Sequence, residues 1–336
     1  MRFKLLFTFL VLGTAFHQLH AQEIEGALNI HTFADNREYA RSNRFSETIF
    51  GLRFAPQIGL LVDSTHRIRV GLNALHEFGS PEFTNKIDPI VYYQYMKQNW
   101  NFYMGVFPRQ DLISDFPRAI LNDTLNYFRP NVEGMLAKFE NKNWRQILFI
   151  DWTSRQTATA RENFIFGLSG RYQPGAFFVS YYGMMLHNAG PGIPIPDDHI
   201  EDNGAAAVKI GVDLSGKTFL DSLTINTGAM MSFERVRTIG GWATPKGVLL
   251  EAHAGYHRFG ITNSFYKGEG HNITMGDKFY RSKTYNRTDL SWSPILFKNV
   301  EGKLALSFHF VDGVVDSQQA FGLRYNIMGS KSLKRN

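Results

Sequence analysis

Acidic and histidine side chains follow one another closely in the C-terminal half, at Glu251, His253 and His257. Residues an even number apart share a face of an extended strand, so these three could approach one another and bind a metal ion. A metal site needs a further ligand, and the surrounding sequence places none beside them. We therefore interpret the three as polar residues that line an interior, and we expect no metal and no cofactor.

Hydrolytic chemistry on a lipid would need a serine beside a histidine on a surface that faces lipid. His76 is the one histidine that the sequence pattern assigns to the lipid-facing surface, and no strand offers it a serine on the same face. A Gly-rich phosphate loop, a His-Glu-x-x-His helix and a nucleophile elbow are also missing from the sequence. We therefore expect no catalytic residues and a protein that is not an enzyme.

The elements that would position these side chains are strands, because apolar and polar residues alternate. Between residues 67 and 78, Ile68 and Val70 fall on one face while Arg69 and Asn73 fall on the other, and Leu75 is the exception. One face suits lipid and the other suits water. The same alternation predicts about sixteen strands, at residues 26–34, 47–61, 67–79, 87–97, 100–107, 132–140, 144–153, 163–172, 176–186, 205–214, 222–234, 248–257, 260–267, 284–296, 302–310 and 318–328.

Connections alternate in length in the same order. Tight turns such as 98–99 and 173–175 follow even-numbered strands, whereas long polar segments such as 190–203 and 268–283 follow odd-numbered ones. Short turns on one side of a membrane and long loops on the other are typical of transmembrane β-barrels. A secreted all-β sandwich is the alternative, but it would rarely need strands this long.

Composition agrees with a barrel and excludes other classes. The chain has 29 Phe, 14 Tyr, 5 Trp and 30 Gly with a mean hydropathy of −0.24, which suits barrel strands. After residue 21 no window approaches eighteen consecutive apolar residues, which excludes a helical membrane protein. Cysteine is absent, which excludes disulfides and the lipid attachment of a lipoprotein. The formal net charge of +6 is weak and dispersed, so we expect no nucleic acid partner.

The first 21 residues have the form of a secretory signal peptide. A basic start is followed by an apolar stretch from Leu5 to Phe16 and a small residue at Ala21. An uncleaved anchor helix is the alternative, although the apolar stretch is short for it. We expect a signal peptide at 1–21, a barrel at 22–328 and a short basic periplasmic tail at 329–336.

The predicted fold class is therefore an all-β transmembrane antiparallel up-and-down β-barrel with about 16 strands, 14 remaining open. An even strand number places both termini on the periplasmic side of the bacterial outer membrane. The longest connection runs from Pro108 to Pro130 and is the third external loop in this count.

In strand number and loop order the chain resembles the general porins of Gram-negative outer membranes. The resemblance implies a pore narrowed by the long third loop. Candidate constriction residues come from that loop and from inward positions of the wall: Arg109, Asp111, Asp115, Arg118, Asp123, Arg53, Arg69, Arg171 and Arg324. The loop acids and wall arginines would set up a transverse field, but the same residues could be scattered solvated charges.

Other inward positions complete the expected lumen. They are Asn73, Glu77, Glu251, His253, His257 and His309. Near the C-terminus, Gly322, Tyr325 and Ile327 have the spacing of a signal read by the barrel-assembly machinery, which is therefore an expected partner.

Function is predicted from barrel size. About sixteen strands leave an aqueous channel, so we expect passive diffusion of small hydrophilic solutes through a barrel surrounded by outer-membrane lipid. A substrate-specific or lipid-conducting transporter, and a closed structural, adhesive or enzymatic barrel, are the alternatives. The sequence leaves open whether the barrel is a monomer or a homo-trimer.

Overall fold

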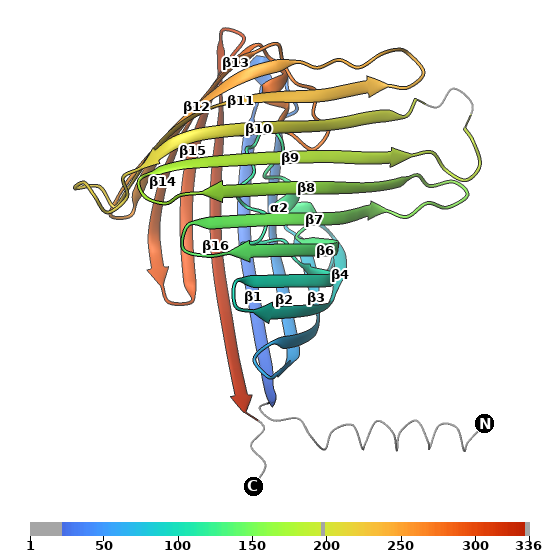
Figure 1. Ribbon diagram of the computed structural model, residues 1–336, viewed down its shortest axis with the longest axis vertical. Coiled ribbons are helices and arrows are strands. Elements are labelled where there is room, and N and C mark those ends of the chain that lie inside the picture. The colour runs from blue at the N-terminus through green and yellow to red at the C-terminus, as the bar shows by residue number, and fades with distance from the viewer. Residues whose placement is uncertain (1–21, 196–198, 333–336) are drawn as a thin grey trace.

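Every strand that crosses a bilayer needs a partner on both edges, because backbone groups cannot hydrogen bond to water there. In a computed structural model, which describes residues 22–195 and 199–332, the chain meets this need by forming a closed barrel (Figure 1). Across these residues sixteen antiparallel strands follow one another in chain order, and β1 (Gln22–Glu38) pairs with β16 (Val314–Ser332) to close the barrel. The predicted fold class is confirmed, with sixteen strands and not fourteen.

The other strands are β2 (Glu47–Val62), β3 (His66–Glu77), β4 (Lys86–Lys97), β5 (Trp100–Pro108), β6 (Asn131–Glu140), β7 (Trp144–Ser154), β8 (Glu162–Tyr172), β9 (Phe177–Ala189), β10 (Glu201–Asp213), β11 (Ser222–Val236), β12 (Lys246–Tyr256), β13 (Phe259–Gly268), β14 (Thr284–Phe297) and β15 (Val300–Val311). Three short helical turns lie in loops, at η2 (Ala40–Ser42), α2 (Leu125–Phe128) and η3 (Lys278–Arg281). Among the described residues, no helix is long and apolar enough to cross a bilayer.

Connections at the two ends of the barrel differ in length. We call the end reached after odd-numbered strands the loop end and the opposite end the turn end. The third loop (109–130) and the seventh loop (269–283) are the longest at the loop end. At the turn end, β16 runs on to Ser332, because β1 pairs with it as far as Glu23↔Ser332. Residues 329–332 of the expected tail are thus part of a strand, while the expected signal peptide and the last four residues lie outside the described residues.

The alternation seen in the sequence separates an outer from an inner face. Ile68 and Val70 of β3 point outward and are 54% and 48% exposed, whereas Arg69 and Asn73 point inward and are each 7% exposed. Leu75 breaks the pattern because it points inward, where it packs with Phe33 and Ile49 in a small apolar cluster.

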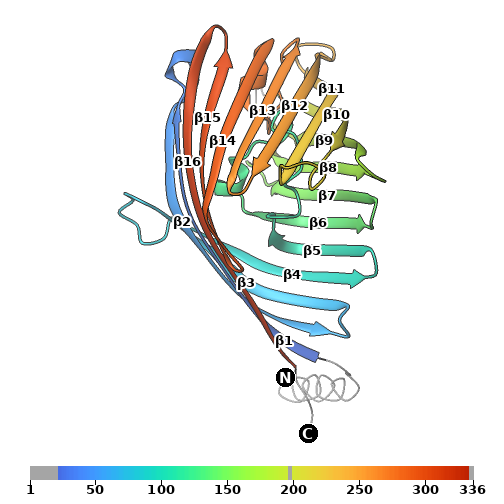
Figure 2. The ribbon, with the colours of Figure 1, turned by 90° about the vertical axis from the view of Figure 1, so that its left-hand side faces the viewer.

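The barrel wall is strongly twisted, as expected for tilted strands. Both views show β6 to β9 running across the molecule, while β16, β1 and β2 run along its long axis (Figures 1 and 2).

The interior contains an apolar core. Inward wall residues such as Phe149 and Tyr285 pack with Phe116 and Ile120 of the third loop and with Phe279 of the seventh. Two loops therefore fold into the barrel and join its core.

Candidate functional site

The third loop is fixed at its base by an arginine. Arg109 is 2% exposed and forms an ion pair with Asp151 of β7. Its Nε donates to the carbonyl of Arg129 at 3.1 Å, and its backbone N–H donates to Pro130 at 2.7 Å. The two ends of the loop are thereby held together beside β7.

From this base the loop crosses the lumen. Phe116 packs on Phe149 of β7, with ring centroids 5.9 Å apart, and Ser169 of β8 donates to Asp115 at 3.3 Å. On the other side of the barrel, Arg53 of β2 donates to the carbonyl of Tyr127 at 2.9 Å. The loop thus contacts both β7–β8 and β2, which are well separated around the barrel.

The third loop meets the seventh in the middle of the barrel. Asn122 N–H donates to Met275 at 2.7 Å, and Asp277 N–H donates to Arg118 at 2.9 Å. A Cβ at Gly276 would lie 2.2 Å from the carbonyl oxygen of Ala119, so this approach requires glycine.

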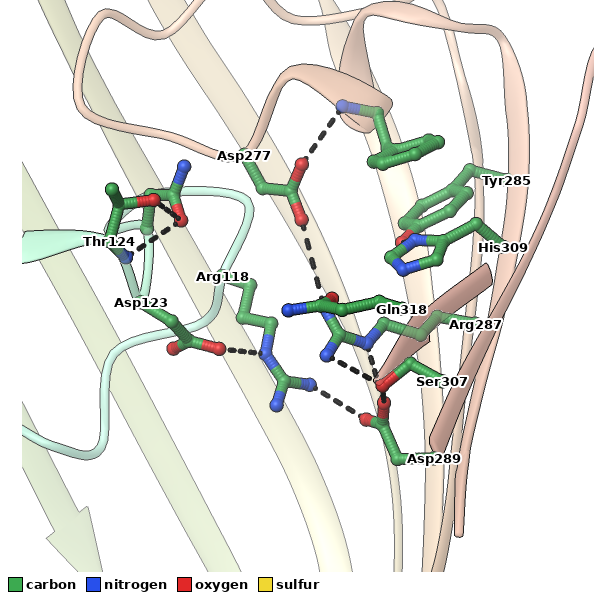
Figure 3. Close-up of polar contacts among 12 residues, drawn as sticks. Arg118, Asp123, Thr124, Asp277, Tyr285, Arg287, Asp289, Ser307, His309 and Gln318 are labelled. Carbon is green, nitrogen blue, oxygen red and sulfur yellow. Dashed lines mark hydrogen bonds and ion pairs between the residues drawn. The ribbon is translucent and has the colours of Figure 1, made fainter. Parts of the chain in front are cut away.

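Charged side chains connect this junction to the wall (Figure 3). Arg118 pairs with Asp123 at 2.6 Å and with Asp289 of β14 at 3.0 Å, and Arg287 pairs with Asp289 at 2.7 Å. Burial alone would lower the pKa of Arg118, but the two aspartates raise it well above its usual value. Burial raises the pKa of Asp277, which lies 4.0 Å from Arg287.

The wall arginines predicted to face the loop acids have other partners. Arg69 pairs with Glu25 at 3.1 Å, Arg171 pairs with Asp213 at 3.3 Å, and Arg53 lies 3.9 Å from Asp88. Within the part of the chain that the structure describes, none of these arginines, nor Arg324, forms an ion pair with an aspartate of the third loop. The structure places Asp111 at a backbone φ of +63° in the loop.

The other predicted lumen residues are dispersed. Asn73 accepts from Arg53 at 2.8 Å, and His309 contacts the hydroxyl of Tyr285 at 2.7 Å. Glu77 lies on the inner face of β3, opposite Gly51 of β2.

The three residues considered for metal binding separate in space. Glu251 pairs with Lys209 at 2.6 Å, His253 contacts Ser222 at 3.0 Å, and His257 lies in the turn after β12. In the described ranges, no three His, Asp or Glu side chains form a group that could bind a metal ion.

The proposed assembly residues lie on the last strand. Gly322 points inward, and Tyr325 and Ile327 point outward from β16.

Two adjoining cavities lie beneath the third loop. Their volumes are about 330 and 440 Å³, and both are lined by His31, Asn126 and Arg324. The lumen is therefore hollow on this side of the loop.

Two serine–histidine contacts occur inside the barrel, which the sequence search for an outward pair did not anticipate. Ser232 Oγ lies 2.8 Å from His271 Nδ1 and 2.7 Å from Glu234, and the serine and histidine are 0% and 2% exposed. Burial lowers the pKa of His271 below its ordinary value. This set is sealed under the seventh loop, whose Asn272 N–H also donates to Glu234 at 2.7 Å, and it fixes that loop to β11.

The second contact joins Ser222 to His253 near the turn end. His253 Nδ1 lies 2.9 Å from the hydroxyl of Thr262. Among the described residues, no carboxylate is hydrogen bonded to either histidine. Both contacts lie within the barrel and away from its outer surface.

The outer surface carries polar side chains in an otherwise apolar region. Thr48 donates to Asn36 at 2.8 Å, and Asn36 Nδ2 donates to Gln319 at 2.7 Å and to Glu38 at 3.0 Å. Gln319 Nε2 donates to Ser317 at 3.1 Å. All of these residues point away from the lumen, near the loop end of β2, β1 and β16.

These side chains extend a longer row that crosses seven strands in register. We call it the outer row, and it consists of Ala254, Ile261, Leu290, Leu306, Gln319, Asn36 and Thr48. It is apolar from β12 to β15 and polar from β16 to β2. The sequence contained a signal for the polar part of this row. Gln319 occupies an outward position of β16, whereas the next two outward positions hold the apolar Phe321 and Leu323.

A closed sixteen-strand barrel with an apolar outer face and a hydrogen-bonded interior defines an outer-membrane β-barrel protein. The chain belongs to the lipid A 3'-O-deacylase-type family, whose model matches residues 16–327. Among curated proteins, none matches the chain in sequence.

Solved structures share the fold at low identity. A loop L8 deletion mutant of OmpT from Vibrio cholerae is 9% identical with a TM-score of 0.56, covering 92% of this chain and 100% of that one. An anion-selective porin from Comamonas acidovorans is 11% identical with a TM-score of 0.53, covering 92% and 100%. OpdK from Pseudomonas aeruginosa is 9% identical with a TM-score of 0.50, covering 91% and 99%. The likeness confirms the porin-like barrel fold.

The family corrects one expectation. It is named for an enzyme, so the prediction that the protein is not an enzyme is wrong. That prediction rested on a search for serine–histidine pairs and linear motifs, and neither detects carboxylate, amide and hydroxyl groups spread over separate strands.

Proposed function

We propose that the protein is an outer-membrane hydrolase that removes an ester-linked acyl chain from a lipid A-type glycolipid of the outer leaflet. The observation that carries this proposal is the hydrogen-bonded set Glu38, Asn36, Thr48, Gln319 and Ser317 on the outer face of the barrel. Polar groups that face lipid are costly and are commonly functional. Membership of a deacylase-type family supports a reaction on lipid.

The arrangement suits hydrolysis by an activated water. Glu38 is exposed at the end of β1 and can accept a proton from a water molecule. The resulting hydroxide attacks the ester carbonyl carbon, the bond to the sugar oxygen breaks, and the leaving alkoxide takes the proton from Glu38. The free N–H of Gln319 and the hydroxyl of Ser317 can donate hydrogen bonds to the oxyanion that forms.

The filled interior gives this site a rigid support. Asn36 and Gln319 lie on the seam between β1 and β16, and the inward residues of this seam contact the third loop, for example through Arg37 and Thr124 at 3.3 Å. We place the loop end outside the cell and both termini in the periplasm, so that the polar set lies in the outer leaflet.

Passive diffusion of small hydrophilic solutes is the second candidate function. The two cavities beneath the third loop favour it, because they give the lumen water-sized space on one side of the loop. The contacts of the third loop with β2, β7 and β8 oppose it, because they extend across the route that a solute would take.

The test is to incubate the purified, refolded protein with lipid A in detergent micelles and to follow loss of an acyl chain by mass spectrometry. We expect Glu38→Gln to lower the rate about 100-fold or more, as for removal of a general base. Glu133→Gln is the matched control, because Glu133 is also an exposed outward carboxylate near the loop end, on β6. Equal rates in the wild type and both variants, or no acyl release by the wild type, would overturn the proposal.

A further inference from the structure

The outer face of the barrel is hollowed where the outer row runs. A groove of about 940 Å³ is lined mainly by outward residues of β12 to β16, β1 and β2. This volume falls within the ~300–1,000 Å³ typical of sites for small ligands. All seven members of the outer row line this groove.

The groove is amphipathic along its length. Between β12 and β15 its lining is apolar and exposed, with Ile261, Leu290 and Leu306 at 46%, 42% and 36% exposure. From β16 onward the lining includes the polar Gln319, Asn36 and Thr48, beside the apolar Ala34, Ala320 and Phe321. The small side chains of Ala254 and Ala34 leave room at either side of this change.

An acylated lipid shows the same change of polarity along its length. An acyl chain gains from contact with an apolar lining, and its ester and sugar need hydrogen-bond donors and acceptors. The polar end of the groove provides these in the amides of Asn36 and Gln319 and in the hydroxyl of Thr48. Leu304 and Phe321 pair with each other where β15 meets β16 and continue the lipid-facing surface of the wall.

We infer that this groove binds one acyl chain of a lipid A-type glycolipid, with the chain across β12 to β15 and its ester beside Gln319 and Asn36. The inference rests on the proposed function, because it names the subsite that presents the ester to Glu38. The inference goes further because it assigns binding of the acyl chain to β12–β15, strands that carry none of the polar set.

Fluorescence quenching can test the site directly, because the chain contains no cysteine and single cysteines can be labelled without interference. Ala34→Cys places a bimane label in the groove, and Ala137→Cys places one on the outer face of β6 as a control. Both proteins are reconstituted in vesicles that contain brominated phosphatidylethanolamine as quencher, and lipid A is then added as an unlabelled competitor.

We expect lipid A at a low mole fraction to relieve quenching at position 34 saturably, with a half-effect at least about tenfold lower than at position 137. A second variant, Ala254→Trp in the Ala34→Cys background, fills the apolar end of the groove and should remove this difference. Equal, unsaturable relief at both positions would overturn the inference. So would disulfide-linked dimers formed through Ala34→Cys alone, because a second copy would then cover the groove.

The two proposals can fail separately. Saturable relief that persists in Glu38→Gln supports the groove even if Glu38 proves dispensable for hydrolysis. Conversely, Glu38-dependent hydrolysis with no difference between positions 34 and 137 overturns the groove and leaves the proposed function in place.

Discussion

Asn36 and Gln319 lie 283 residues apart in the chain and face each other on the outside of the barrel, where Asn36 Nδ2 donates to Gln319 Oε1 at 2.7 Å. They lie on β1 and β16, the two strands that close the barrel. The seam of the fold therefore also carries polar groups that face lipid.

Replacement of both residues by leucine separates function from stability. When both partners of a hydrogen bond are replaced by apolar groups, the effect on stability is small or favourable. Thr48, Glu38 and Ser317 each lose a partner, but two leucines on the lipid-facing surface offset this loss. We expect Asn36→Leu with Gln319→Leu to leave the free energy of unfolding in urea unchanged or higher, and to lower the rate of acyl release about tenfold or more.

The matched control is Asn263→Leu with Asn286→Leu. These two residues also point outward and are hydrogen bonded to each other at 3.1 and 3.0 Å, but they lie on β13 and β14. This double variant should retain its acyl release. Full activity in the Asn36 and Gln319 double variant would contradict the role given to the polar set.

The junction of the third and seventh loops depends on Gly276. A Cβ at this position would lie 2.2 Å from the carbonyl oxygen of Ala119, so Gly276→Ala must push the loops apart. We expect a loss of about 1–3 kcal/mol in the free energy of unfolding, as for an overpacked core. Gly240→Ala, where nothing lies within 4 Å, should have little effect and serves as the control. Similar urea midpoints for the two variants would show that the loops do not pack as described.

Removal of the third loop should turn the barrel into an open pore. Replacement of residues 112–127 by a short Gly-Ser linker removes the contacts with β2, β8 and the seventh loop but leaves the Arg109–Asp151 base intact. We expect stable single-channel steps of nanosiemens order in a planar bilayer, because sixteen strands enclose an aqueous channel when nothing fills it. The wild type should conduct at least about tenfold less.

Shortening the loop between β3 and β4 is the control for this deletion. Its Phe83 is 94% exposed, so the loop lies away from the lumen and its loss should not raise conductance. Large steps from the wild type would instead favour the diffusion channel.

Acid should loosen the seventh loop. Burial lowers the pKa of His271 below its ordinary value of 6.5, so the unfolded loop binds a proton more readily than the folded one. The contribution of His271 to the stability of the folded loop is complete when the pH is above that ordinary value, and it falls as the pH drops below it. We expect faster amide hydrogen exchange in residues 269–283 at pH ~5.5 than at ~7.5 after correction for intrinsic rates. His271→Asn should remove most of this difference, whereas His66→Gln, at the turn end, should leave it unchanged.

Much of the fold could be predicted from local pattern. The alternation around Ile68 and Arg69 fixes which face meets lipid, and the alternation of turns and loops fixes the strand order, because both depend on residues near one another in the chain. Leu75, the exception to the pattern, has a cause outside its own strand, since it packs inside with Phe33 of β1 and Ile49 of β2.

The site could not be predicted in the same way. Arg118 of the third loop and Asp289 of β14 are 171 residues apart and meet only because the third loop folds into the lumen. Sequence reasoning assigned Arg118 to a charged constriction, and the structure places it in a junction between loops. The third loop was recognised by its length, but its path across the barrel depends on contacts with strands from both halves of the chain.

The sequence by itself determined the barrel and the two faces of its wall and predicted about sixteen strands, because strand alternation and turn chemistry are local properties. Tertiary structure alone decided that the lumen is crossed by two packed loops and that Glu38, Asn36 and Gln319 form one polar set. The polar set forms because the barrel closes. Closure pairs the first strand with the last and brings together side chains that lie near opposite ends of the chain.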